Sequence, residues 1–307
     1  MDTRKDREFM KVRCLQTTGQ GNFEEVEYDK PDLNLVEIEV QAVMTGVCRS
    51  DIDMMTGSFG PLPLNMQGHE GLGIVTKVGH HVYDVKVGDY VATRGEPAYA
   101  DYYNVRKNEY VKVPELHPRY ILEPVACGVN IIKQARQEIN KRCGPNSRLL
   151  ILGSGFLAWV AHHTLQIDNY EIKIDVVGNS NRDLWGDKLS PNPLGKYDVV
   201  VDLGSSDLVF NSDILQTNAL IIMGSQKMIS TDFSNLLWKA CTMIFPSPRN
   251  PDFIKYMKKA EEWITSGKLN VDNFWTQAYN RDTEWQQAFA DGLARPSGYS
   301  RGYIKWL

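Results

Sequence analysis

The hydrophobic pattern of this 307-residue chain changes character near Pro124, and the change restricts the folds that the chain can adopt. Before this point, short segments alternate apolar and polar residues, as "VEIEVQAV" does at 36–43. After it, nearly continuous apolar segments such as "RLLIL" at 148–152 alternate with helix-compatible stretches such as "FLAWVAHHTLQ" at 156–166. The first pattern is typical of half-buried antiparallel strands, and the second indicates a parallel sheet covered by helices. The sequence therefore predicts a small β-barrel or sandwich over roughly residues 10–120, followed by an α/β domain.

Composition and charge exclude several classes of protein. Apolar residues make up 42% of the chain, which is enough for two buried cores, and a net charge of −4 gives no basic footprint for nucleic acid. The polar start "MDTRKDREFM" does not have the pattern of a secretory signal, and no segment reaches the ~18 apolar residues of a membrane span. The five cysteines are scattered, which favours a reducing compartment. We therefore expect a cytoplasmic protein with no nucleic-acid or membrane partner.

A glycine-rich motif follows the apolar strand at 148–152. Gly153, Gly155 and Ala158 form G-x-G-x-x-A at the start of the next helix, where missing side chains allow a pyrophosphate to approach the backbone. A tight turn that binds nothing is the alternative, but the flanking strand, the helix and a second strand favour dinucleotide binding. The candidate nucleotide-binding residues at the turn are Gly153, Gly155, Phe156 and Leu157.

The end of the second strand distinguishes the two nicotinamide cofactors, because an acidic residue there pairs with the ribose hydroxyls and repels a 2′-phosphate. This chain has Asn179 and Ser180 at that position, with Arg182 close enough to meet a phosphate. Asp175 precedes the end of the strand by several residues and is not assigned to the ribose. The sequence therefore favours NADP, with NAD as the other choice and a solvated surface role for Arg182 as the alternative.

Three further segments carry residue types that bind metals: "TGVCRSDID", "GHEGLGIVTKVG" and "LEPVACGV". Together with the nucleotide turn, they resemble the zinc-containing medium-chain dehydrogenases, the alcohol and polyol dehydrogenase group. The resemblance extends to "YDVVVDLG" and to a closing segment that ends "FADGLARPSGYSRGYIKW". It implies a GroES-like β-barrel catalytic domain at 1–124, a Rossmann-type doubly wound parallel-sheet nucleotide domain at 125–265, and a return to the catalytic domain at 266–307.

The same resemblance implies a role for each polar residue of these segments. Cys48 and His69 would be ligands of a catalytic zinc ion, and Glu123 would be the third. Three protein ligands leave a fourth position for water or substrate. Asp51 would hold the other ring nitrogen of His69, and Glu70 would approach the metal transiently during ligand exchange.

Each proposed ligand also has a purely structural interpretation. Cys48 could be a small buried thiol, and His69 could be a histidine satisfied within a turn. Glu123 could simply mark the domain junction. The metal site is excluded only if all three structural interpretations are correct. Cys127 is a weaker rival for the third position. The remaining histidines are interpreted as surface or packing residues: His80, His81, His117, His162 and His163.

The chain departs from the family pattern in three places. The stretch "TRGEPAYADYYNV" contains no cysteine, so one zinc ion is expected, without the family's second, four-cysteine site. Asp53 stands where a proton-relay histidine is often found, which leaves Ser50, followed by Asp53 or water, as the predicted relay. The segment 179–197 is too short for the usual helix and strand, which predicts a trimmed nucleotide domain with weaker cofactor binding.

These observations predict an NAD(P)-dependent alcohol or polyol dehydrogenase with one Zn²⁺ per chain, acting on a small alcohol, polyol or carbonyl compound. A catalytically idle nucleotide-binding or regulatory protein of the same fold is the first alternative, and a zinc-free quinone-reductase-like enzyme is the second. The substrate pocket is expected near Phe59, Met66 and Trp275. A homodimer joined through "NALIIMGS" at 218–225 is left open.

Overall fold

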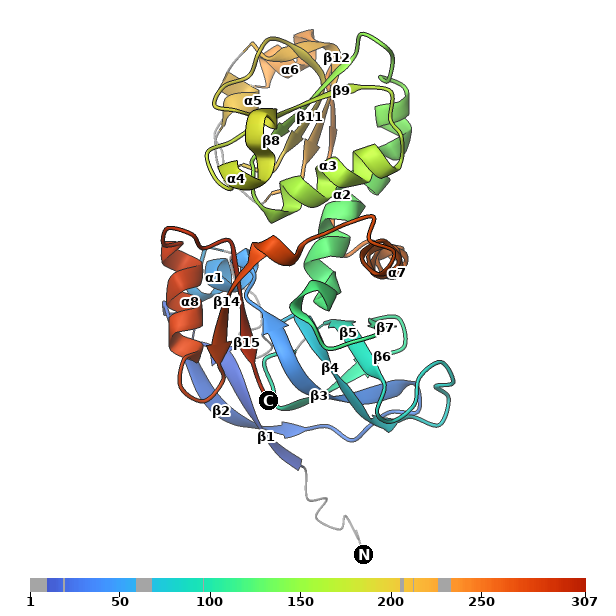
Figure 1. Cartoon of the computed structure of the whole chain (residues 1–307), viewed down its shortest axis with the longest axis vertical. Coiled ribbons are helices and arrows are strands. Elements are labelled where there is room, and N and C mark those ends of the chain that lie inside the picture. The colour runs from blue at the N-terminus through green and yellow to red at the C-terminus, as the bar shows by residue number, and fades with distance from the viewer. Residues whose placement is uncertain are drawn as a thin grey trace, which may run out of the picture. The chain divides into compact units, whose positions relative to one another are not determined.

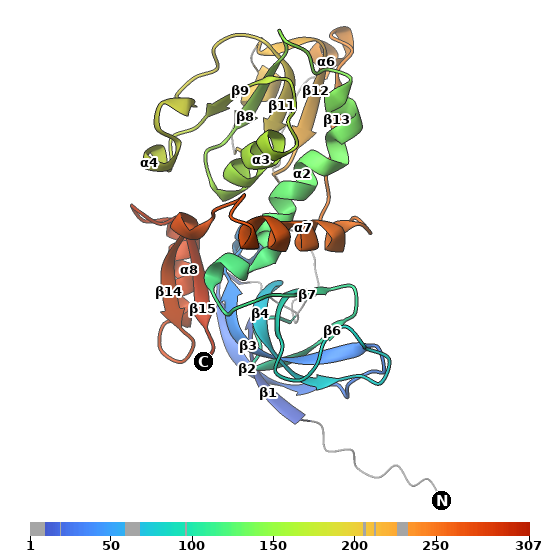
Figure 2. The same ribbon diagram turned by 45° about the vertical axis from the view of Figure 1, so that its right-hand side comes forward.

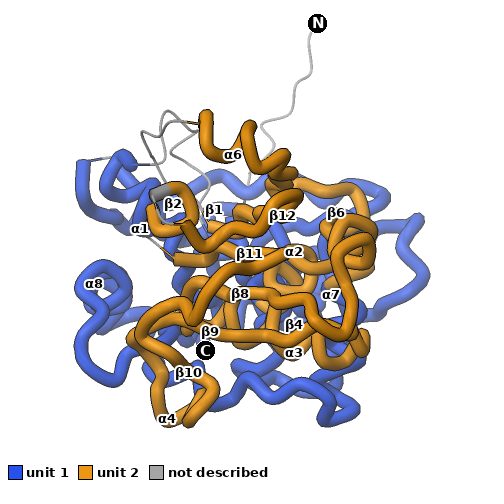
Figure 3. The backbone as a smooth tube through the Cα atoms, turned by 90° about the horizontal axis from the view of Figure 1, so that it is seen from above, with its two compact units in different colours: residues 1–124, 257–307 blue, residues 125–256 orange. Residues whose placement is uncertain are grey.

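The computed structural model describes residues 10–18, 20–58, 68–95, 97–204, 207–211, 213–225 and 233–307. The chain divides into two compact units, one comprising residues 1–124 and 257–307 and the other residues 125–256 (Figure 3). The first boundary lies where the hydrophobic pattern changes, and the second lies inside helix α7 (Phe253–Thr265) rather than after residue 265. Of the expected pocket residues, Phe59 and Met66 lie outside the described residues.

The first unit is built mainly on antiparallel strands (Figure 1). Its larger sheet has the strand order β14-β15-β3-β4-β5-β7, with β6 paired to β3, and its smaller sheet pairs β1 with β2. The strands are β1 (Met10–Thr17), β2 (Phe23–Lys30), β3 (Glu37–Gly46), β4 (Glu70–Val78), β5 (Tyr90–Arg94), β6 (Tyr102–Arg106), β7 (Tyr110–Lys112), β14 (Trp275–Asn280) and β15 (Arg301–Lys305). Helices α1 (Arg49–Met55) and α8 (Trp285–Ala294) add Ile52 and Phe289 to the core between the sheets.

Strand β3 is more buried than its alternating pattern predicts. Glu39, expected on a solvent-facing side, is only 2% exposed. Its carboxylate lies 2.8 Å from Nζ of Lys30 and 3.0 Å from Nζ of Lys77. The strand pairs with β4, β6 and β15, so it is central in the sheet and its polar face is covered. The prediction of a half-buried strand was therefore wrong in burial, because paired charges allow glutamates on a covered face.

The second unit contains a sheet of parallel strands in the order β10-β9-β8-β11-β12-β13 (Figure 2). Counted from β8, this is the 3-2-1-4-5-6 order of doubly wound nucleotide-binding sheets. The strands are β8 (Arg148–Leu152), β9 (Lys173–Val177), β10 (Leu189–Ser190), β11 (Tyr197–Asp202), β12 (Leu215–Met223) and β13 (Thr242–Ile244). Helices α2 (Leu122–Asn140) and α3 (Phe156–Ile167) pack on one face, and α5 (Leu208–Asn211) and α6 (Ser234–Trp238) on the other. The Rossmann-type architecture expected for this half is confirmed.

The connection between β9 and β11 is short, as its sequence predicts. It contains the four-residue helix α4 (Arg182–Trp185), the 3₁₀ turn η2 (Gly186–Lys188) and the two-residue strand β10. The expectation that no strand fits here was wrong, because two residues suffice to extend the sheet beside β9. The helix, by contrast, is reduced to about one turn.

The C-terminal segments complete the first unit. Helix α7 buries Phe253, Met257 and Trp263, and Gly267 adopts a φ of +73° just beyond its end. Such a positive φ is typical of a glycine that terminates a helix. The first unit also contains two 3₁₀ turns, η1 (Pro118–Tyr120) and η3 (Asp272–Phe274). Among the described residues, we find no helix with the length and hydropathy needed to cross a membrane.

Candidate metal centre and nucleotide turn

Cys48 immediately precedes helix α1 and is held by that helix. Its backbone N–H donates to Oδ2 of Asp51 at 3.0 Å, which ties the residue to the first helical turn. The hydroxyl of Ser50 donates to the Cys48 sulfur at 3.2 Å. The sulfur atom is therefore fixed by local contacts that need no metal.

His69 lies one residue before strand β4, and both of its ring nitrogens face polar groups of α1. Nδ1 lies 3.5 Å from Oδ1 of Asp51, and Nε2 lies 3.5 Å from Oγ of Ser50. Asp51 is fully buried, and its Oδ2 accepts a hydrogen bond of 2.8 Å from the Tyr99 hydroxyl. The structure thus brings Asp51 to one ring nitrogen and Ser50 to the other, while the orienting role of Asp51 stays a prediction.

The pKa shifts in this cluster reflect burial first and the charges of the neighbouring groups second. Burial raises the pKa of the Cys48 thiol, and the negative charge of Glu70 raises it further. Burial also raises the pKa of Asp51. For His69, burial alone would lower the pKa, but the charges of Asp51 and Cys48 outweigh it and raise the pKa well above its ordinary value. A cation at this position would relieve the same repulsion.

Glu70 begins strand β4 and is fully buried. Its Oε2 forms a close ion pair with Arg301 of β15, whose guanidinium lies 4.9 Å from the centre of the Trp275 ring. A Cβ atom at Gly46 would come within 2.0 Å of the same carboxylate, so glycine at that position leaves room for it. The other oxygen, Oε1, has no hydrogen-bond partner in the part of the chain that the structure describes. A buried carboxylate oxygen without a partner is costly unless something binds it.

Cys48, His69 and Glu70 form the candidate metal cluster, since each offers a ligand atom within 4.8 Å of the others. A thiolate, an imidazole and a carboxylate oxygen are all accepted zinc ligands, so the donor set fits this metal. Glu123, the third ligand predicted from the sequence, begins α2 and is 5% exposed. Its charge contributes to raising the pKa of His69, but it lies outside the cluster.

The predicted relay residue Asp53 has a different partner. Its Oδ1 accepts a hydrogen bond of 2.8 Å from Nε of Arg49, one helical turn earlier in α1. Ser50, by contrast, lies against both Cys48 and His69. Of the predicted relay, the structure therefore brings Ser50 to the cluster and directs Asp53 toward Arg49.

The nucleotide turn joins β8 to α3 in the second unit. Gly153 has a φ of +118°, and a Cβ atom there would lie 3.2 Å from the carbonyl oxygen of Leu203. Gly155 immediately precedes α3 and has open space where a Cβ would stand, so a ligand can approach its backbone. The neighbouring Phe156 is buried and Leu157 is partly buried against the core under α3.

The turn is tied to the end of β9 through Ser154. The Ser154 hydroxyl lies 3.0 Å from Oγ of Ser180 and accepts the Ser180 N–H at 3.0 Å. The side chains of Asn181 and Trp185 both donate to the Ser154 carbonyl at 2.9 Å. These bonds hold the turn in one conformation without a bound cofactor.

Of the residues expected to select the cofactor, Asn179, Ser180 and Arg182 are exposed near the end of β9. Asp175 is engaged elsewhere, since its Oδ2 lies 2.5 Å from Nη2 of Arg148 on the adjacent strand β8. The ion pair of Asp175 with Arg148 is therefore consistent with the prediction that Asp175 does not bind the ribose.

Sequence reasoning missed several residues of these two sites. Arg301 carries no motif, and only its distant pairing with Glu70 across the fold gives it a role. Tyr99 is likewise recognisable only by its contact with Asp51. Ser154 is the variable position of the glycine motif, and Trp185 lies in the shortened connection. A buried residue contacted from far away in the sequence leaves no local signal.

Comparisons with known proteins find relatives of part of the sequence. Residues 34–115 match the family model of the alcohol dehydrogenase GroES-like domain. An alcohol dehydrogenase of Moraxella sp. is 38% identical over 85 residues, which cover 27% of this chain and 25% of that protein. D-xylulose reductase A of Aspergillus oryzae is 28% identical over 155 residues, covering 39% of this chain and 42% of that protein. The chain thus matches less than half the length of either curated relative.

A solved structure extends the likeness over nearly the whole chain. The alcohol dehydrogenase TADH from Thermus sp. ATN1 superimposes with a TM-score of 0.76, covering 96% of this chain and 99% of that chain at 16% identity. At this identity the match shows a shared fold. The first unit therefore contains a match to the alcohol dehydrogenase GroES-like domain at residues 34–115, and nearly the whole chain shares the fold of this dehydrogenase.

Proposed function

We propose that the chain is a zinc-dependent oxidoreductase that transfers a hydride between a nicotinamide cofactor and an alcohol, a polyol or the corresponding carbonyl compound. The observation that carries the proposal is the convergence of Cys48, His69 and Glu70, whose ligand atoms lie within 4.8 Å of one another. The names of the two relatives, an alcohol dehydrogenase and a D-xylulose reductase, support the substrate class. We further propose a cytoplasmic location, in line with the scattered cysteines. The segment 218–225, expected as a dimer seam, lies largely in β12, which is paired with both β11 and β13, so the expectation that it forms a free edge was wrong. A homodimer through another surface is left open.

Zinc at this cluster would supply Lewis acidity to the substrate oxygen, which stabilises the charge that develops during hydride transfer. The chain's own residues prepare the place for it. Cys48 and His69 provide one sulfur and one nitrogen donor, and Asp51, itself bonded by Tyr99, keeps the imidazole oriented. Because Asp51 is buried and engaged, the ring nitrogen that faces Ser50 and Cys48 is the one available to a metal.

Two carboxylates compete for the third ligand position, and we propose Glu123. Glu70 belongs to the cluster by distance, but its Oε2 is committed to Arg301, which offsets its charge. Its unpartnered Oε1 suits a transient ligand that replaces another during exchange. Glu123 is buried and close enough to influence His69, and the Glu-Pro motif of the polyol dehydrogenases supports it.

Proton transfer is assigned to Ser50. Its hydroxyl lies against the sulfur of Cys48 and the Nε2 of His69, so it is within reach of a group bound at the cluster. A hydroxyl both donates and accepts, which allows it to pass the proton of an alcohol on to water. Asp53 is not required for this route, since it bonds Arg49.

The nicotinamide cofactor is assigned to the turn at Gly153 and Gly155, where the N-terminus of α3 can receive a pyrophosphate. We propose NADP as the preferred form, because Arg182 is exposed after β9 and no acid stands at Asn179 or Ser180. NAD is the other choice.

The test combines metal content with activity. Purified protein is analysed for zinc, and oxidation of NADPH and NADH is followed with simple aldehydes, ketones and ketoses. The proposal expects about one zinc per chain and turnover that disappears with Cys48→Ser. Turnover by protein free of zinc would refute it.

A catalytically idle nucleotide-binding protein is the second candidate, favoured by the shortened connection around α4 and by the absence of a relay histidine at Asp53. It predicts cofactor binding with zinc bound but no turnover across the whole substrate panel.

A further inference from the structure

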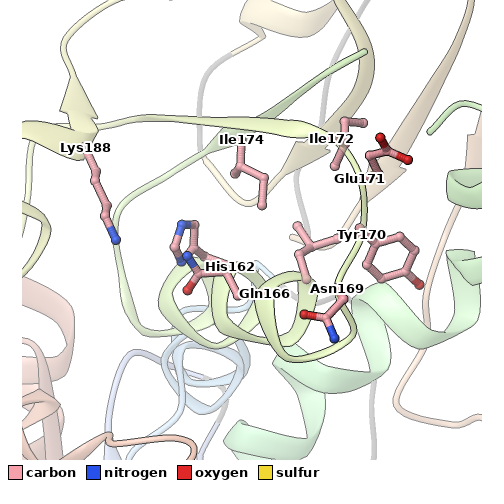
Figure 4. A pocket seen from close by; sticks show the side chains of 9 residues that line it. His162, Gln166, Asn169, Tyr170, Glu171, Ile172, Ile174 and Lys188 are labelled. Atoms are coloured by element: carbon pink, nitrogen blue, oxygen red, sulfur yellow. The ribbon is translucent and has the colours of Figure 1, made fainter. Parts of the chain in front are cut away.

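The second unit contains a cavity that the proposed function does not use. Its volume is about 620 Å³, and it lies between the C-terminal half of α3, the segment that leads into β9, and Lys188 of η2 (Figure 4). Small-molecule sites in proteins have volumes of roughly 300–1,000 Å³, so this one is large enough for an organic ligand. All of its lining residues belong to the second unit.

The shortened connection explains why this space exists. In a doubly wound sheet, a full helix between β9 and β10 would pack beside α3 on the same face. Here that helix is the four-residue α4. Leu165, Ile172 and Ile174 therefore form an apolar wall of the cavity, with the two isoleucines only partly buried.

Polar groups without partners accompany this apolar wall. His162 is 4% exposed and lines the cavity, and its Nδ1 has no hydrogen-bond partner among the described residues. The hydroxyl of Tyr170 is likewise buried without a partner in the part of the chain that is described. Both atoms are shielded from solvent, so they lie behind the wall of the cavity and do not face its open space.

The charges at the cavity are separated. Figure 4 shows Lys188 beyond His162 at one end, with Glu171 and Tyr170 at the other. Within the described ranges, the Lys188 ammonium forms no ion pair or hydrogen bond, whereas its charge is felt at His162. Burial, followed by the charges of His163 and Lys188, lowers the pKa of His162 to about 4, so the ring is neutral near pH 7. Lys188 is exposed, so its ammonium group is accessible to a ligand, and the neutral imidazole beside it adds no second charge at this end.

We infer that the cavity binds a small organic monoanion with an apolar body, whose carboxylate pairs with Lys188 beside the His162 imidazole and whose hydrocarbon part covers Ile174 and Leu165. Glu171 repels a second negative charge at the far end, which restricts the ligand to one anionic group. The structural interpretation of His162 as a packing residue is thereby extended to a ligand-facing role.

The cavity is also next to a natural reporter. The Trp185 ring centre lies 5.3 Å from that of His162, and its Nε1 donates to the Ser154 carbonyl of the nucleotide turn. An occupant in contact with His162 therefore changes the surroundings of Trp185. Tryptophan fluorescence gives a second readout beside calorimetry.

The experiment titrates the full chain, without cofactor or substrate, with sodium octanoate, and compares octanol and octylammonium chloride. We expect saturable octanoate binding with a Kd below about 1 mM. Lys188→Met should weaken octanoate binding at least about tenfold, since a charge-assisted contact is lost. Lys173→Met is the matched control, because Lys173 is exposed on β9 and its side chain lies on the opposite face of the strand from Ile174. This variant should bind octanoate as tightly as wild type does.

A second variant guards against indirect effects. Gln166→Trp, at an exposed lining position of α3, should fill the cavity and abolish octanoate binding with an unchanged melting temperature. The inference is overturned if wild type does not bind octanoate, if Lys188→Met binds it as tightly as wild type, or if octylammonium binds equally well. Because neither zinc nor turnover enters the measurement, its failure is distinct from failure of the proposed dehydrogenase activity.

Discussion

The candidate metal cluster and the nucleotide turn differ in the number of contacts that hold their residues in place. Around Cys48 and His69, the neighbouring polar groups come from near and far in the sequence: Asp51, bonded by Tyr99, lies beside the imidazole, and Arg301 pairs with Glu70. Around Gly153 and Gly155, the turn is held by Ser154 and its partners after β9, but the helix that follows is only α4. The candidate metal cluster is therefore surrounded by contacts from several elements, whereas the nucleotide turn is followed by a shortened connection.

This difference leads to different expectations for substitutions at the two sites. A metal site misplaced by a fraction of an ångström loses its chemistry, whereas a nucleotide domain can lose part of a crossover and keep its parallel sheet. The chain keeps the sheet order of the complete fold with a two-residue strand β10. We therefore expect variants at the metal centre to abolish activity and variants at the end of β9 to alter cofactor affinity.

The largest effect is expected for Cys48→Ser. Loss of the thiolate should remove zinc and lower kcat/KM by about a thousandfold or more, because Lewis-acid stabilisation contributes several kcal/mol. Zinc content by mass spectrometry and steady-state kinetics measure it. Ser50→Thr, which keeps a hydroxyl, is the matched control and should retain zinc. A Cys48→Ser protein with full zinc and turnover would show that the two sites do not differ as described.

The next comparison is between the two carboxylates. Glu123→Gln should weaken zinc affinity more than about a hundredfold, and Glu70→Gln by less than about tenfold, since a lost ligand costs more than a lost neighbour. Competition with a chelator gives both values. Because Glu70→Gln leaves the buried Arg301 without its carboxylate, the double variant Glu70→Gln/Arg301→Met controls for instability. The reverse order would make Glu70 the third ligand.

A smaller effect is expected for the orienting group. Asp51→Asn should lower zinc affinity or kcat/KM by roughly 10–100-fold, because the imidazole loses its charged partner. Tyr99→Phe removes one hydrogen bond to the same carboxylate and should act in the same direction but more weakly. If Asp51→Asn changes only the melting temperature and leaves zinc affinity intact, Asp51 is structural.

The smallest effect is expected at the nucleotide domain. Arg182→Ala should raise KM for NADPH by about tenfold, equivalent to about 1.4 kcal/mol, and leave KM for NADH unchanged. Because Arg182 is exposed, the melting temperature should not move. Equal effects on the KM values of both cofactors would contradict the proposed contact between Arg182 and the 2′-phosphate.

Much of the fold could be predicted from periodicity. The apolar run of β8 led to the correct strand type, because its pattern reflects two buried faces. The alternation in β3 predicted an antiparallel strand correctly, but not its burial. The burial of Glu39 could not be predicted, since it depends on Lys30 and Lys77 from other strands. Strand β10 was missed because two residues carry no period.

Those residues of the candidate metal cluster that belong to sequence motifs could be predicted. Cys48 and His69 were recognised by residue type and context, and the structure brings them together. The partners of Glu70 and Asp51 were not, because Arg301 and Tyr99 lie far away in the sequence. The relative positions of Glu70 and Glu123 depend on tertiary packing, which no local pattern reports.

X-ray absorption spectroscopy at the zinc edge of the purified protein tests the central claim most directly. The account predicts about one zinc per chain with a single sulfur neighbour near 2.3 Å and nitrogen or oxygen neighbours at about 2.0–2.2 Å. The sulfur signal should disappear in Cys48→Ser. Protein that binds no zinc, or zinc whose shell has no sulfur, would contradict the account.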